Sequence, residues 1–456
     1  MIPAATRLTA AGFVATAVAF GPARMGFGLF LPAFRAEFAL ATSTAGLIAS
    51  GGFLAFLLAL VASAWLGRRH GERVPVIVGG LAATAGFVAV AAAGAPSLLA
   101  LGIALAGASA GLCWAPFNDA AERVLPHAAR AGALSVISTG TTFGVVVAAG
   151  LAFAVTAGVL DWRAAWIGFA LGGVALAGLA LAGLPSSRRG AHPARDAMAQ
   201  IVLAALPSDP ELDAELDPEP AGARLTRRAV LPLYATALCY GIANAVFLSF
   251  AADRVVVAGG LAGLPDEAAS TVIFLAYGIC GVLGLATGRI EARIGLAPLL
   301  CAIFAAAALS LVLIAVAPTS WSAVLAASGL HGVAVMMVSA VFSFWSLRLF
   351  PGYGTLGFTA TLLAVAAGSV LGPALAGFVA TSLGARTMFL AAAVPPLATA
   401  LWFGAKLGRP RPRLPPVPGP RWRGRAAEAT VARVLARRRE RWARHAGRPD
   451  RDAGGG

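Results

Sequence analysis

Long apolar segments follow one another along the chain, and they constrain its fold more than any other feature. A helix needs about 20 apolar residues to cross the hydrocarbon core of a bilayer. Backbone groups in lipid must be hydrogen-bonded within the segment, so such segments are helices. We place twelve predicted spans at residues 8–32, 43–66, 74–95, 97–121, 131–158, 163–184, 229–252, 268–289, 295–317, 321–347, 355–382 and 385–405. The sequence therefore predicts an all-α membrane protein.

The composition excludes a soluble globular protein. Of the 456 residues, 59% are hydrophobic and only 12% are charged. A single soluble core stops growing at roughly 250–300 residues, so much of the apolar surface must face lipid. The four cysteines lie in apolar segments at irregular spacing, which indicates reduced core residues. We predict no metal site and no cofactor.

The formal net charge of +15 is concentrated at the C-terminus. Residues 409–452 contain fourteen arginines and four acidic residues, a net contribution of +10. Two interpretations of this tail stay open: a solvated segment, or a segment that binds anionic lipid of the inner leaflet. The remaining charge is close to what membrane topology requires, so we do not predict nucleic-acid binding.

Two loop sequences occur twice. Arg69-His70-Gly71 recurs as Arg293-Ile294-Gly295, and Arg123-Val124-Leu125-Pro126 recurs as Arg348-Leu349-Phe350-Pro351. The first pair follows the second span of each half and the second pair follows the fourth, which indicates a duplicated bundle. We therefore predict two pseudo-symmetric six-helix bundles, at residues 1–184 and 229–406, with a linker at 185–228 and a basic tail at 407–456.

Arginines in the loops predict the orientation, because cytoplasmic loops carry an excess of basic residues. One side has eight arginines, at positions 68, 69, 73, 123, 130, 289, 293 and 348, and the other has four, at positions 35, 163, 254 and 386. The side with eight also takes the N-terminus, the linker and the tail. We expect both termini in the cytoplasm.

This organisation resembles the major facilitator superfamily over residues 8–405. The family's loop signature reads Gly-x-x-x-Asp-Arg-x-Gly-Arg-Arg. Residues 64–73 read Ala-Trp-Leu-Gly-Arg-Arg-His-Gly-Glu-Arg, so the core matches but Ala64 and Arg68 replace the leading Gly and the Asp. The segment 21–28 resembles a bacterial branch with an arginine in the first span. The resemblance implies a multi-pass protein of the bacterial inner membrane, and we expect a monomer.

Arg24 is the most informative single residue, because a charge near the bilayer centre costs about 2.5–3.5 kcal/mol. It follows Gly21-Pro22, and proline bends a helix. Aligning residues 20–27 with 240–247 sets Arg24 opposite Asn244. We predict a substrate site there; a buried structural arginine is the open alternative. The other candidate substrate-binding residues are Phe27, Trp114, Asn118, Tyr240, Phe247 and Tyr277.

Two further sets of residues are candidates for coupling and gating. His331 is the one histidine inside a predicted span, and it or Asp119 is the candidate for proton coupling; a structural histidine is the alternative. We also hypothesise a cytoplasmic charge cluster that opens with the inner gate. Its members are Arg69, Arg73, Asp119, Glu122, Arg123, Arg293 and Arg348.

Together these features predict a secondary active transporter that moves a small organic solute by alternating access. Arg24 favours an anionic solute, and the family resemblance implies proton coupling. The alternatives are a membrane sensor or scaffold, a drug-type efflux antiporter, and a membrane enzyme or lipid flippase. The fifth span lacks the proline of the drug antiporters' Gly-Pro motif, the spans lack a reactive cluster, and no nucleotide-binding loop is present.

Overall fold

The computed structural model describes residues 4–125, 127–184, 228–265, 268–350 and 354–405, and every regular element in these ranges is helical. Twelve helical segments are long and apolar enough to span a membrane, which confirms the predicted number of spans. The predicted linker and basic tail lie outside the described residues, and the domain boundaries stay a prediction. The helices are α1 (Ala4–Phe20), α2 (Pro22–Phe38), α3 (Thr42–His70), α4 (Arg73–Ala91), α5 (Pro96–Val124), α6 (His127–Thr156), α7 (Trp162–Gly183), α11 (Leu231–Val257), α12 (Ala268–Gly281), α13 (Thr287–Ile294), α14 (Leu296–Val316), α15 (Trp321–Leu349), α16 (Gly354–Leu383) and α17 (Ala385–Gly404).

The first span is longer than predicted and is broken in the middle. It extends over Ala5–Phe38, and Gly21 separates α1 from α2. Pro22 has no N–H to donate to the preceding turn, and Gly21 adopts φ −80° and ψ −104°, outside the helical region. The break therefore has a local cause in the sequence, and it lies just before Arg24.

The two halves repeat the same helix packing. In the first half α1 packs on α6, and in the second half α11 packs on α16. Glycines permit the close approach: a Cβ on Gly144 would overlap the carbonyl oxygen of Ala17, and one on Gly368 would overlap that of Leu238. Close backbone contact at small residues is how helices associate where lipid gives no hydrophobic drive.

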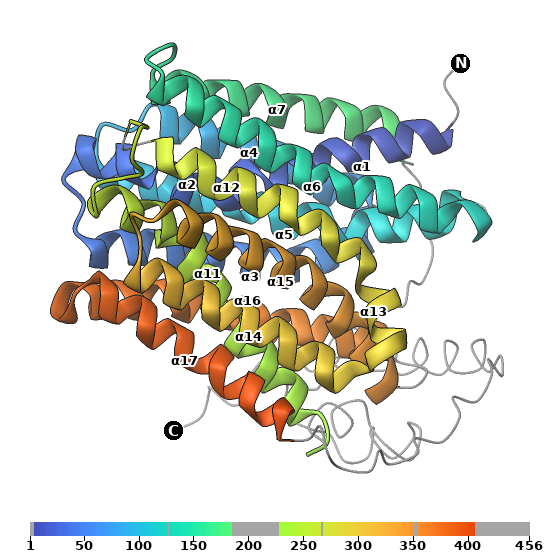
Figure 1. Ribbon diagram of the computed structural model, residues 1–456. Coiled ribbons are helices and arrows are strands. Elements are labelled where there is room, and N and C mark those ends of the chain that lie inside the picture. The colour runs from blue at the N-terminus through green and yellow to red at the C-terminus, as the bar shows by residue number, and fades with distance from the viewer. Residues whose placement is uncertain (1–3, 126, 185–227, 266–267, 351–353, 406–456) are drawn as a thin grey trace, which may run out of the picture.

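Figure 1 shows α4, α6 and α7 on one side of the molecule and α14, α16 and α17 on the other. The halves meet where α2 packs on α11, α3 on α16, and α6 on α12. A Cβ on Gly28 would overlap the carbonyl oxygen of Leu248, and one on Gly46 would overlap that of Pro373. These contacts lie toward the end that holds the short connections at 38–42, 156–162 and 383–385, which we call the closed end.

Outward-facing side chains are apolar, as expected for helices in contact with lipid. Leucines such as Leu58, Leu171, Leu285 and Leu401 are more than 60% exposed on four different parts of the fold. In water such a large apolar surface would promote aggregation. Inside the first half, aromatic rings pack around the fully buried Trp166 and hold α2 against α4 and α7.

Candidate functional site

A cavity lies between the two halves, beside the break in the first span. About 430 Å³ of space not filled by protein atoms lies within and in front of it, and this volume includes open solvent. Helices α2, α3 and α5 of the first half and α11 of the second half form its wall. The lining residues are Ala23, Arg24, Phe27, Gly28, Ala49, Gly52, Phe53, Phe56, Ile103, Gly107, Ala110, Leu248 and Ser249.

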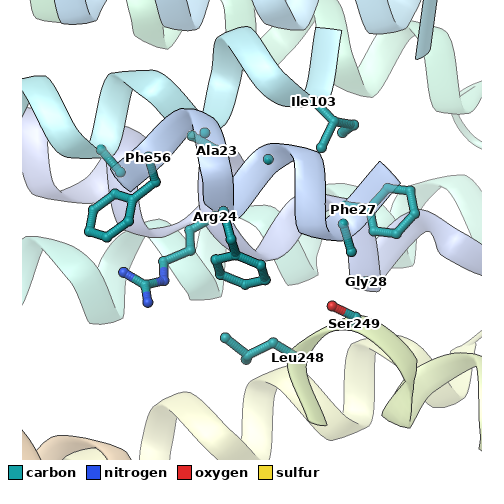
Figure 2. A pocket seen from close by; sticks show the side chains of 13 residues that line it. Ala23, Arg24, Phe27, Gly28, Phe56, Ile103, Leu248 and Ser249 are labelled. Atoms are coloured by element: carbon teal, nitrogen blue, oxygen red, sulfur yellow. The ribbon is translucent and has the colours of Figure 1, made fainter. Parts of the chain in front are cut away.

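Arg24 brings the one charge among these lining residues. Its guanidinium carbon lies 5.0 Å from the ring centre of Phe56, 5.7 Å from that of Phe53 and 5.8 Å from that of Phe20. These distances permit cation–π attraction. No ion pair joins Arg24 to any residue that the structure describes. In Figure 2 its guanidinium points into the space between α2 and α11. The site thus presents a cation with no described counter-ion.

The second half faces Arg24 with hydroxyl groups and an apolar side chain. Leu248 and Ser249 of α11 lie across the cavity from Arg24, as Figure 2 shows. The phenols of Tyr240 and Tyr277 are within electrostatic range of its guanidinium. Tyr277 is fully buried, and its hydroxyl has no hydrogen-bond partner among the described residues.

Asn244 lies on α11 one turn before Leu248, and its place opposite Arg24 stays a prediction. It is 2% exposed, it does not line the cavity, and its Oδ1 has no described hydrogen-bond partner. Leu248, one helical turn further along α11, lines the cavity instead. The two segments also differ in their backbone: α11 is a continuous helix, whereas the first span breaks before Pro22.

His331 and Phe247 belong to a buried cluster in the second half rather than to the cavity wall. The rings of His331 and Phe247 stack with centres 4.0 Å apart and an 8° interplanar angle. His331 Nδ1 is hydrogen-bonded to the hydroxyl of Ser310 at 2.7 Å, and Nε2 is buried without a described partner. The ring centre of Tyr277 lies 6.3 Å from that of the imidazole, so Tyr277 belongs to the same cluster.

The predicted charge cluster is only partly described. Arg69 lies over the ring of Trp65 at 4.5 Å, and Arg73 donates to the carbonyl oxygen of Leu181. Arg348 pairs with Glu291 at 2.7 Å, which is within the second half. Arg293 is exposed. The side chains of Trp114, Asn118, Asp119, Glu122 and Arg123 lie outside the described residues. The described contacts of these arginines stay within one half.

An ion pair that sequence reasoning missed joins the two halves at the closed end. Arg35 Nη1 of α2 lies 2.7 Å from Asp253 Oδ2 of α11. Arg35 also donates to the carbonyl oxygen of Leu40 and to the hydroxyl of Thr42, the first residue of α3. Asp253 could be recognised in the sequence as an acidic residue near the end of a span, but the sequence did not indicate that Arg35 is its partner.

A helical bundle in two similar halves around a charged cavity is the architecture of a membrane transporter. The sequence matches the profile of the Major Facilitator Superfamily over residues 12–297, more than half of the chain. The chain belongs to this family of secondary transporters and is a multi-pass membrane protein, not an enzyme.

Solved structures show the same fold at low sequence identity. A mutant of the nucleoside transporter NupG is 13% identical with a TM-score of 0.69, over 88% of this chain and 99% of that one. A mutant of a peptide transporter POT in complex with sulfate is 14% identical with a TM-score of 0.69, over 89% and 94%. A bacterial homolog to the human lysosomal transporter Spinster is 15% identical with a TM-score of 0.64, over 90% and 100%. No curated protein matches the sequence.

Proposed function

We propose that the protein transports a small organic anion by alternating access, and that Arg24 binds the anionic group. The observation that carries this proposal is a guanidinium in the cavity between the halves without a described counter-ion. A buried charge is retained where it has a partner or a function. Carboxylate, sulfonate and phosphate groups match the planar donor geometry of arginine.

The position of Arg24 suits a carrier. The side chain stands on α2, just past the break at Gly21, and α2 contacts the second half through α11. A rocking motion of the halves changes the α2–α11 distance. The contacts of a ligand held between these helices therefore depend on which end of the protein is open. Basic-residue bias favours cytoplasmic termini in the inner membrane. In that orientation the closed end faces outward.

Exchange of labelled solute into proteoliposomes tests the proposal. Organic anions, neutral analogues and organic cations of equal size are compared for counterflow by the wild-type protein. We expect anions alone to exchange, and we expect Arg24→Gln to reduce their exchange about 10- to 100-fold, the value of one charge-assisted hydrogen bond. Arg24→Lys keeps the positive charge but loses the planar guanidinium that can donate two parallel hydrogen bonds to one anion, so it should retain partial activity.

Arg386→Gln is the matched control, because Arg386 is exposed at the start of α17 and outside the cavity. It should exchange anions at the wild-type rate. Cation exchange by the wild-type protein would favour drug-type efflux instead, and a folded protein without any flux would favour a sensor. Either result contradicts the proposal.

Proton coupling belongs to the same proposal, with His331 as the candidate group. Its Nδ1 is held by Ser310 and its Nε2 is free among the described residues, so one ring nitrogen is available. A pH gradient should drive anion accumulation by the wild-type protein. His331→Gln should keep counterflow but lose this accumulation. If it keeps the accumulation, Asp119→Asn is the next variant to test.

A further inference from the structure

The composition of the cavity wall also carries information about the body of the solute. We propose that the site selects a monoanion with an apolar body of ring size, such as an aromatic or branched carboxylate, over polyols, zwitterions and small polar anions. The inference rests on the proposed function, because it takes Arg24 as the group that binds the anion.

Among the described lining residues the wall carries a positive charge and no carboxylate, which disfavours a zwitterion. Arg24 is the one charged residue among the thirteen that line the cavity. Two described carboxylates at the closed end, Asp253 and Glu37, are already paired with Arg35 and Arg163. An ammonium group on the ligand would therefore enter the cavity without a described counter-ion, and a buried unpaired charge is strongly unfavourable.

The wall offers few hydrogen bonds. Among the described lining residues, Ser249 is the one polar side chain apart from Arg24, and eight of the others are aliphatic residues or glycines on α2, α3, α5 and α11. A sugar-like ligand buries several hydroxyl groups, and each of them needs a partner to avoid a desolvation cost. An apolar body instead gains free energy from leaving water.

Aromatic rings around Arg24 favour a planar group beside the anion. Phe53 and Phe56 of α3 and Phe27 of α2 all line the cavity. Phe56 lies nearest the guanidinium, and Figure 2 shows Arg24 between Phe56 and the α11 side of the cavity. A carboxylate on Arg24 would place its attached ring against these phenyl groups, where offset or edge contacts are favourable.

A binding series on the purified full-length protein tests the inference. The probes are benzoate, acetate, lactate, benzyl alcohol, benzylamine, phenylalanine and glucose, each titrated by thermal shift and by competition with labelled benzoate. We expect benzoate to bind at least 10-fold more tightly than acetate or lactate, roughly the value of burying two or more methylene groups. We expect no competition from benzyl alcohol, benzylamine, phenylalanine or glucose.

Two variants separate the apolar contact from the charge. Phe56→Leu should weaken benzoate binding about 5- to 10-fold, the value of one aromatic pair, and should weaken acetate binding by a smaller factor. Phe378→Leu, on an exposed part of α16 that faces lipid, is the matched control and should bind benzoate like the wild-type protein. Arg24→Gln should abolish the binding of every anion.

The outcomes distinguish this inference from the proposed function. Equal affinity for benzoate and acetate, both lost in Arg24→Gln, overturns the selectivity and leaves the anion site standing. Equal competition by phenylalanine overturns the exclusion of zwitterions in the same way. Anion binding that Arg24→Gln does not change overturns both proposals.

Discussion

Arg35 and Asp253 form a 2.7 Å ion pair that connects the first and second halves across 218 residues of sequence. Asp253 has 8% of its side-chain surface exposed and Arg35 has 25%, so water competes only in part for this contact. The pair lies at the closed end, beside the α2–α11 and α3–α16 contacts. Its geometry makes it a contact that must break when this end opens.

Breaking this ion pair should therefore favour opening of the closed end. Asp253→Asn removes a charge-assisted hydrogen bond, a loss of about 1.5–3 kcal/mol, so the closed-to-open ratio should fall roughly 10- to 100-fold. Distances between spin labels on Val159 and Leu383, which are exposed on opposite halves at this end, measure the populations. An unchanged distance distribution would show that the pair is only incidental to closure.

Arg163→Gln is the control for this prediction. It breaks the Arg163–Glu37 pair, whose atoms lie 2.9 Å apart at the same end but within the first half. Both side chains are substantially exposed, and such pairs contribute about 0–1 kcal/mol. The label distances should stay at their wild-type values.

A second test of closure uses two glycines on α3. A Cβ on Gly46 would overlap the carbonyl oxygen of Pro373 in α16, whereas one on Gly51 would meet nothing within 4 Å. Gly46→Ala should therefore separate α3 from α16 and increase thiol labelling of a cysteine placed at Thr42. Gly51→Ala should not. Equal labelling of the two variants would mean that the halves are not in contact here.

The packing of α1 on α6 predicts a stability difference within one helix. A Cβ on Gly144 would overlap the carbonyl oxygen of Ala17, while Gly150 has nothing within 4 Å. Gly144→Ala should lower the free energy of unfolding by about 1–3 kcal/mol, as overpacking does. Gly150→Ala should be neutral or slightly stabilising. Thermal melting in detergent measures both, and a Gly144→Ala protein as stable as Gly150→Ala would contradict this packing.

The number and order of the spans could be predicted from sequence because hydropathy reports directly on lipid burial. Arg24 could be found for a related reason, since a charge stands out in an apolar segment. Phe53 and Phe56 could not, because a phenylalanine facing a cavity and one facing lipid have the same sequence signature. The Arg35–Asp253 contact was equally hidden, since nothing local relates residues on different halves.

The alignment of the halves predicted some features of the site and missed others. It paired Gly21 with Gly241, and both lie against the backbone of the helix that packs on theirs: Gly21 against Gly144, and Gly241 against Val365 and Ser369. It also set Asn244 opposite Arg24, but the described cavity lining includes Leu248 and Ser249 of α11 and not Asn244. Similar sequences at the two positions do not ensure similar exposure, because one segment is broken by proline and the other is continuous.

Chemical rescue of the charge at position 24 tests whether a cation there binds the transported anion. Arg24→Cys, in a background that lacks Cys113, Cys239, Cys280 and Cys301, is treated with aminoethyl or methyl methanethiosulfonate, and benzoate and acetate exchange is measured in proteoliposomes. We predict that the unmodified and methyl-modified proteins are inactive and that the positively charged aminoethyl adduct restores anion exchange. Full activity of the unmodified variant, or equal activity of the two adducts, would show that anion exchange does not need a positive charge at position 24.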